Sequence, residues 1–128
     1  MEKFFHLLDE QDNIEKIMAG FDIGTLTSLS EAFPNVIGEI MSCGVPCVST
    51  NVGDSQMIIG KTGITTPPKD PLALSKAWEK LLFSKERVTL GEKARERIVI
   101  SFSMPEIAKQ YEDFYSHLNQ QQYLPNRQ

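Results

Sequence analysis

The stretch SLSEAFPNVIGEIMSCGVP, residues 28–46, decides how this chain folds. Pro34 suits the first position of a helix, because its fixed φ is helical and its missing N–H would have no partner there. Gly44 suits the left-handed residue that commonly ends a helix. The sequence therefore predicts a short helix from Pro34 to about Cys43.

This helix has an apolar and a polar face. A period of 3.6 residues separates two sets, Val36, Ile37, Ile40 and Met41 on one face and Asn35, Gly38, Glu39 and Ser42 on the other. We expect the first face to build core and the second to meet a ligand. Gly38 costs roughly 1 kcal/mol relative to Ala inside a helix, so we expect close approach there by a ligand or by a neighbouring helix.

Two glutamates stand eight positions apart across the start of the helix. Glu31 lies just before the helix, where free N–H groups and the positive end of the helix dipole favour a phosphate. Glu39 lies further along the polar face. One carboxylate suits a sugar and the other a ribose, although two such glutamates are commonly solvated or capping groups and their spacing alone assigns no role.

The longer string SLSEAFPNVIGEIMSCGVPCVSTNVGD, residues 28–54, closely resembles the donor-binding segment of the retaining GT-B glycosyltransferases of group 1, with their E-x7-E motif. The resemblance continues at GKTG, residues 60–63, at PPKDP, residues 67–71, and at YEDFY, residues 111–115. It covers the chain from Phe4 to about Leu118. It implies a site for a nucleotide diphosphate sugar, linked to UDP or GDP, with no cofactor and no metal.

The resemblance also implies residue roles. Glu31, the catalytic candidate, would contact sugar hydroxyls near the reacting centre and position the sugar rather than act as a nucleophile, and Glu39 would hold the ribose. The other expected donor contacts come from Ala32, Phe33, Asn35, Val36, Gly53 and Asp54. Ala32 stands where the family usually has Gly, so a positive φ there would cost roughly 1 kcal/mol or more.

The fold class that we expect is α/β, a partial Rossmann-like parallel sheet of about four strands with helices on both faces. The predicted strands are Phe4–Leu8, Phe21–Thr27, Val45–Ser49 and Ile64–Thr66. Besides the helix from Pro34, we expect five helices between and after these strands. They begin at an Asp12/Glu15 capping box, at Asp54 or Ser55, at Asp70-Pro71, at Lys85, and at a Ser103/Glu106 capping box. Trp78, on the helix from Asp70-Pro71, is expected in the core. The predicted organisation is one partial domain, residues 1–118, and a polar flexible tail, residues 119–128.

At 128 residues the chain has room for one domain of ordinary size, whereas a GT-B enzyme has two. The resemblance implies that the acceptor-binding domain, the first units of the donor domain and the basic pair that neutralises the diphosphate are absent. Lys61 and Lys69 are interpreted as solvated loop charges. Tyr111, Phe114 and Leu118 belong to the predicted buried stripe of the last helix, which becomes a surface for an acceptor-binding domain or a second copy if left exposed.

Composition excludes some partners. A net charge of −4 without a basic face argues against nucleic acid. No apolar run approaches the ~20 residues that span a bilayer, so we expect a cytoplasmic protein without a membrane span, with peripheral contact at the inner membrane face only as part of a full enzyme. Cys43 and Cys47 are spaced unlike a zinc ribbon and are interpreted as reduced structural thiols.

Three functions remain open. The first is transfer of a sugar from a nucleotide diphosphate sugar to a hydroxyl acceptor, with retention, when the missing half is supplied. The second is a non-catalytic fragment, or a subunit of a split transferase, that binds only a nucleotide sugar or a partner chain. The third is a nucleotide-sugar epimerase of the same fold.

Overall fold

The computed structural model describes residues 4–122. Three short strands, β1 (Gly24–Leu26), β2 (Cys47–Thr50) and β3 (Ile64–Thr66), form a parallel sheet in the order β1-β2-β3. Gly24 pairs with Cys47, and Val48 pairs with Ile64. Each connection contains a helix, as is usual between parallel strands. The α/β class with a parallel sheet is therefore confirmed.

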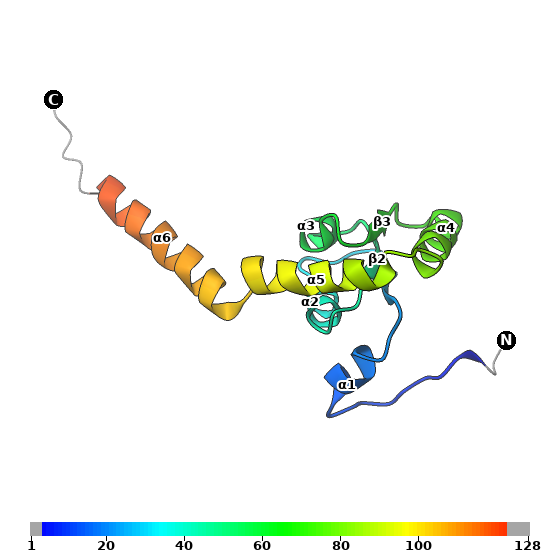
Figure 1. Ribbon diagram of the computed structural model, residues 1–128. Helices are drawn as coiled ribbons and strands as arrows, with labels where there is room; N and C mark the ends of the chain where they lie inside the picture. The colour runs from blue at the N-terminus through cyan, green and yellow to red at the C-terminus, as the bar shows by residue number, and fades with distance from the viewer. Residues whose placement is uncertain (1–3, 123–128) are drawn as a thin grey trace.

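Helices cover both faces of this sheet (Figure 1). The connecting helices are α2 (Asn35–Ser42) and α3 (Ser55–Ile59), which share the larger core cluster with Cys47. The opposite face carries α4 (Pro71–Leu82), whose Ala77 and Leu81 pack on Val48. The alternation of Cys47 and Val48 between the two clusters follows from the period of two along a strand.

The predicted central helix forms with small changes at its ends. Pro34 is the residue before α2 rather than its first residue, and Gly44 has the expected positive φ of 78°. Ile37 and Met41 are almost completely buried, while Asn35 and Glu39 are exposed. The division into a core face and a polar face is confirmed.

Two long helices follow the sheet, α5 (Arg87–Ser101) and α6 (Met104–Gln122). Gly91 and Ala94 of α5 are buried against the body, and a Cβ on Gly91 would lie 2.0 Å from the carbonyl oxygen of Gly44. α6 extends away from the body in Figure 1. The close contact at Gly91 was not predicted from the sequence.

Arginines of α5 bind the carbonyl ends of three other helices. The N–H groups donate from Arg87 to Leu82 of α4 at 2.6 Å, from Arg95 to Ser42 of α2, and from Arg97 to Met57 and Ile58 of α3 at 2.6 and 2.8 Å. Cations are favourable at helix C-termini because they satisfy orphan carbonyls and complement the dipole. α5 therefore connects the C-terminal ends of α2, α3 and α4 as well as covering the core.

The predicted first strand is wrong. Phe4–Leu8 forms no strand, and Phe4, Phe5 and Leu7 are 85%, 70% and 99% exposed. A run this short gains stability as a strand only when a neighbour accepts its hydrogen bonds, and the described sheet pairs no strand with it. The sheet accordingly has three strands within the described residues instead of about four.

Three smaller predictions also need correction. The helix α1 (Ile14–Met18) begins after Asn13 without a side-chain cap, so the Asp12/Glu15 capping box is wrong. Trp78 is 39% exposed and therefore is not core, and its indole N–H donates to Thr25 Oγ1 of the edge strand β1 at 2.9 Å. α6 runs to Gln122, so residues 119–122 are helical, and the rest of the predicted tail, residues 123–128, lies outside the described residues.

Candidate functional site

The loop between β1 and α2 carries Glu31 at the carboxyl end of β1, where open α/β sheets place their ligands. The Ser28 hydroxyl donates to Glu31 Oε1 at 2.7 Å, and the Thr50 hydroxyl donates to the Ser28 carbonyl oxygen at 2.7 Å. Glu31 is half-buried. A chain of two hydrogen bonds thus connects the end of β2 to one oxygen of the Glu31 carboxylate.

A second loop, between β2 and α3, locks onto the first. The Asp54 amide donates to the Ala32 carbonyl oxygen at 2.9 Å. Gly53 has a φ of 52°, and a Cβ there would lie 2.3 Å from the Ala32 oxygen and 2.4 Å from the Glu31 oxygen. Only glycine fits this contact. The structure therefore brings Glu31, Ala32, Gly53 and Asp54 together at the carboxyl edge of the sheet.

The strain expected at Ala32 is absent. Within residues 4–122, Lys69 is the only non-glycine residue with a positive φ, at 61°. Ala32 is exposed, and its backbone carbonyl is the acceptor for the second loop. Alanine is therefore compatible with the conformation that this loop adopts.

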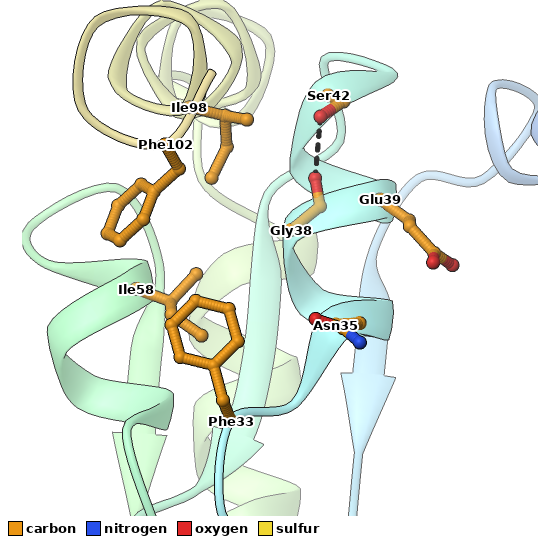
Figure 2. A pocket seen from close by; sticks show the side chains of 8 residues that line it. All are labelled: Phe33, Asn35, Gly38, Glu39, Ser42, Ile58, Ile98 and Phe102. Carbon is orange, nitrogen blue, oxygen red and sulfur yellow. Dashed lines mark hydrogen bonds between the residues drawn. The ribbon is translucent and has the colours of Figure 1, made fainter. Parts of the chain in front are cut away.

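The polar face of α2 borders a hollow of about 250 Å³ between α2, α3 and α5 (Figure 2). A Cβ on Gly38 would meet nothing within 4 Å, so no neighbouring helix of the described chain explains this glycine. The hollow is lined by Phe33, Asn35, Gly38, Glu39, Ser42, Ile58, Ile98 and Phe102. One side is polar and the other apolar, with the Glu39 carboxylate directed away from the Phe33 and Phe102 rings in Figure 2.

The predicted site residues fall into two groups. Phe33, Asn35 and Glu39 line the hollow, whereas Glu31 belongs to the locked loops. The Phe33 ring packs against Phe102 with centroids 6.2 Å apart, so its side chain joins the loop to the end of α5. The Val36 side chain packs against the larger core cluster. Any contact of Val36 with a nucleotide-sugar donor would therefore come from its backbone.

Sequence reasoning missed several contributors. Ser28 and Thr50 hold the loop, and the Ser-x-x-Glu spacing of Ser28 and Glu31 is a signal of a local side-chain contact of this kind. Phe102 and Ile58 complete the hollow from segments distant in sequence. No local pattern identifies those two residues, because their role depends on how α3 and α5 pack.

A second hollow, of about 170 Å³, lies at the carboxyl edge of the sheet and beside the start of α4. Its lining includes Thr27, Thr50 and Lys69. Asp70 also lines it, and this carboxylate already accepts the Ala73 amide at 2.8 Å as the cap of α4. Lys61 and Lys69 are exposed, as predicted.

The two thiols differ in environment. Cys47 is buried on β2, and this burial raises the pKa of its thiol to about 12. Cys43 is half-buried, and neither cysteine forms a disulfide. The prediction of free structural thiols is confirmed. Across the described residues, no group of three His, Cys, Asp or Glu side chains is arranged to hold a metal ion.

Comparison with known proteins identifies the family. The model of the family described as glycosyl transferases group 1 matches residues 1–84. The chain belongs to this family. It is 36% identical over 111 residues to N-acetyl-alpha-D-glucosaminyl L-malate synthase of Bacillus anthracis, a match that covers 84% of this chain and 29% of that protein. It is 33% identical over 101 residues to an exopolysaccharide phosphotransferase of Streptomyces coelicolor, covering 76% of this chain and 11% of that protein.

A solved structure agrees with this group 1 assignment. Sucrose-phosphate synthase from Thermosynechococcus elongatus superimposes with a TM-score of 0.71 at 31% identity, over 80% of this chain and 26% of that one. The predicted family and GT-B resemblance are therefore confirmed. The chain spans less than a third of the length of these relatives. No helix between residues 4 and 122 is long and apolar enough to cross a membrane.

Proposed function

We propose that this group 1 chain provides the donor half of a retaining glycosyl-transfer site. It binds a nucleotide diphosphate sugar, linked to UDP or GDP, and supports transfer to a hydroxyl acceptor when an acceptor-binding domain completes the cleft. The observation that carries the proposal is the Glu31 carboxylate, held by Ser28 in a loop that Gly53 and Asp54 lock at the carboxyl edge of the sheet.

Glu31 has the chemistry of a sugar-positioning group. One carboxylate oxygen already accepts the Ser28 hydroxyl at 2.7 Å, which fixes the side chain. The carboxylate keeps further lone pairs for sugar hydroxyls. Hydrogen bonds to an ionised acceptor are worth roughly 1.5 to 3 kcal/mol each, so a fixed carboxylate orients a sugar with little loss of rotamer freedom.

The start of α2 suits the diphosphate. No side chain caps this helix at Pro34, so its first N–H groups have no side-chain acceptor. Such groups and the positive end of the dipole favour an anion and stabilise the charge that develops on a departing diphosphate. Glu39, exposed on the polar face, is the proposed ligand for the ribose hydroxyls.

A second candidate is binding without turnover. Within the described part of the chain, the hollow beside α2 is lined by no Lys or Arg, which a diphosphate site normally includes. This lining favours binding of the donor without turnover by the described residues alone.

The test of binding is an NMR titration of the full chain with UDP, GDP and their sugars. We expect saturable shifts of the amides in residues 31–39 and 53–55. Glu39→Gln should weaken nucleotide binding about tenfold, and Glu96→Gln, an exposed glutamate on α5, should leave affinity unchanged. A folded chain without shifts at millimolar ligand would contradict donor binding.

The test of transfer adds the acceptor-binding domain of a group 1 relative. Glu31→Gln should lower the transfer rate more than donor affinity, and the product should keep the anomeric configuration of the donor. Donor binding without transfer would favour the binding subunit. Isomerisation of the donor sugar without an acceptor would favour an epimerase instead.

A further inference from the structure

The Glu31 carboxylate is connected to the core of the sheet through two side-chain hydroxyls. Thr50 is the last residue of β2 and is 5% exposed. Its hydroxyl donates to the Ser28 carbonyl oxygen at 2.7 Å, across 22 positions of the sequence. The Ser28 hydroxyl in turn donates to Glu31 Oε1 at 2.7 Å. A buried strand residue therefore holds Ser28 in place, and Ser28 holds the carboxylate.

Thr50 also holds the second loop of the site, between β2 and α3. Its carbonyl oxygen accepts the Val52 amide at 3.0 Å and the Ser49 hydroxyl at 2.9 Å. The same loop continues to Gly53 and Asp54, which lock onto the loop of Glu31. The hydroxyl of Thr50 thus fixes the first loop, and its carbonyl group fixes the start of the second.

The neighbouring strand offers an internal comparison. Thr66 is the last residue of β3 and the register partner of Thr50, and it is also 5% exposed. Among residues 4–122, the Thr66 hydroxyl has no hydrogen-bond partner. Burial of a hydroxyl without a partner costs free energy, whereas burial with a partner does not. Two paired threonines of equal burial therefore differ in whether their hydroxyl holds another segment.

The stiffness of Thr50 suits a supporting role. A β-branched side chain has a restricted χ1, and the interior around a buried residue is closely packed. A glutamate side chain, in contrast, rotates about several bonds and loses this freedom when it binds a ligand. Here Ser28 restricts the Glu31 carboxylate before a ligand arrives and leaves its other oxygen for sugar hydroxyls. Such preorganisation favours both binding and reaction.

We infer that Thr50 is a positioning residue for Glu31 and acts through Ser28. Thr50 donates to the backbone of Ser28, and the Ser28 side chain donates to the carboxylate, so a change at Thr50 reaches Glu31 through two hydrogen bonds. The sugar that Glu31 orients rests on the proposed function, whereas the position of its side chain is a property of the chain without a ligand.

NMR of the full chain without a ligand tests the positioning. Three-bond couplings report the rotamer populations of the Glu31 side chain. We expect one dominant rotamer in the wild type and averaging over several rotamers in Ser28→Ala and Thr50→Val. Thr50→Ser keeps the hydroxyl and should restore the single rotamer.

The matched control is Thr66→Val, which removes an equally buried hydroxyl that holds no segment. It should leave the Glu31 rotamer unchanged. The amide spectrum of each variant shows whether it keeps the wild-type fold, and Thr50→Ala replaces Thr50→Val if the latter does not fold. A single Glu31 rotamer in a folded Thr50→Val or Thr50→Ala chain would overturn the inference, and so would equal averaging in Thr66→Val.

Donor affinity tests the consequence for the site. Ser28→Ala should weaken binding of a UDP- or GDP-linked sugar about tenfold, and Thr50→Val about threefold, because the carboxylate is no longer held. Affinity for UDP or GDP without the sugar should stay unchanged in both variants. Equal losses for nucleotide and nucleotide sugar would overturn the sugar-positioning role. Rotamer averaging in a chain that binds no nucleotide sugar would overturn the proposed function and still support the positioning of Glu31 by Thr50.

Discussion

α5 and α6 are consecutive helices of 15 and 19 residues, yet their surroundings differ. α5 buries Gly91 and Ala94 and binds the carbonyl ends of α2 and α3 through Arg95 and Arg97. α6 presents aromatic side chains to solvent. A small residue that admits a neighbouring backbone, together with arginines that find acceptors, distinguishes a helix fixed to the body from one that extends away from it.

Between the two helices, the largest expected effect is at Gly91 of α5. Gly91→Ala places a Cβ 2.0 Å from the Gly44 oxygen, so α5 must move away from the turn after α2. We expect a loss of about 3 kcal/mol in the free energy of unfolding by urea. The matched change Gly38→Ala meets open space and should gain up to about 1 kcal/mol. Equal effects of the two changes would contradict the close contact.

Arg97 should have the next largest effect. Arg97→Ala removes two hydrogen bonds to the end of α3 and the contact of the guanidinium with the Phe102 ring, 5.7 Å away. We expect urea unfolding to show a loss of about 2 kcal/mol. Lys93→Ala, exposed on the same helix, should change stability by less than about 0.5 kcal/mol. A loss no larger than this control would show that the arginine contact is not stabilising.

Burial of Cys47 beneath α2 and α5 gives a pH dependence. Its thiol pKa is raised to about 12, so the folded protein holds a proton that the unfolded chain releases above pH ~9. The free energy of unfolding therefore keeps the full contribution of this thiol below pH ~9. It falls by up to about 1.4 kcal/mol per pH unit as the pH rises from there towards the folded pKa. The difference between wild type and Cys47→Ala isolates this slope. Parallel profiles would contradict the assignment.

The smallest effect is expected in α6. Tyr111→Gln should change the free energy of unfolding by less than about 0.5 kcal/mol, because the side chain is exposed. Leu81→Ala in the α4 core cluster should cost roughly 2 to 5 kcal/mol. A comparable loss at Tyr111 would show that α6 is part of the body.

The sequence predicted much of the body because local signals there agree with the tertiary fold. Ile64–Thr66 is a strand, as predicted, and Asp70 caps α4 through the Ala73 amide at the predicted start of that helix. The inward face of α2 also followed from its period. In each case turn chemistry and apolar spacing pointed to the same answer.

The failures share a physical cause. The apolar pattern of Phe4–Leu8 indicates a strand, but a strand forms only where a neighbour offers hydrogen bonds. The apolar stripe around Tyr111 indicates burial, but it does not say what buries it. The arginine contacts of α5 and the Phe102 side of the hollow depend on helix packing, which no local spacing encodes. At the candidate site, the sequence indicated the loops but not the Thr50 and Ser28 hydrogen bonds.

The contacts around α3 close a ring. The Ala32 carbonyl holds the amide of Asp54 at the start of α3, Arg97 holds the other end of that helix, and the Phe102 ring returns to Phe33 in the loop of Ala32. These contacts hold the loop of Ala32, α3 and the end of α5 together, so the three segments move as one unit unless one of the contacts opens. The Asp54 amide is therefore expected to exchange its hydrogen only when one of these contacts opens. The exchange rate of this one amide then reports whether the loop of Ala32 and the end of α5 move together.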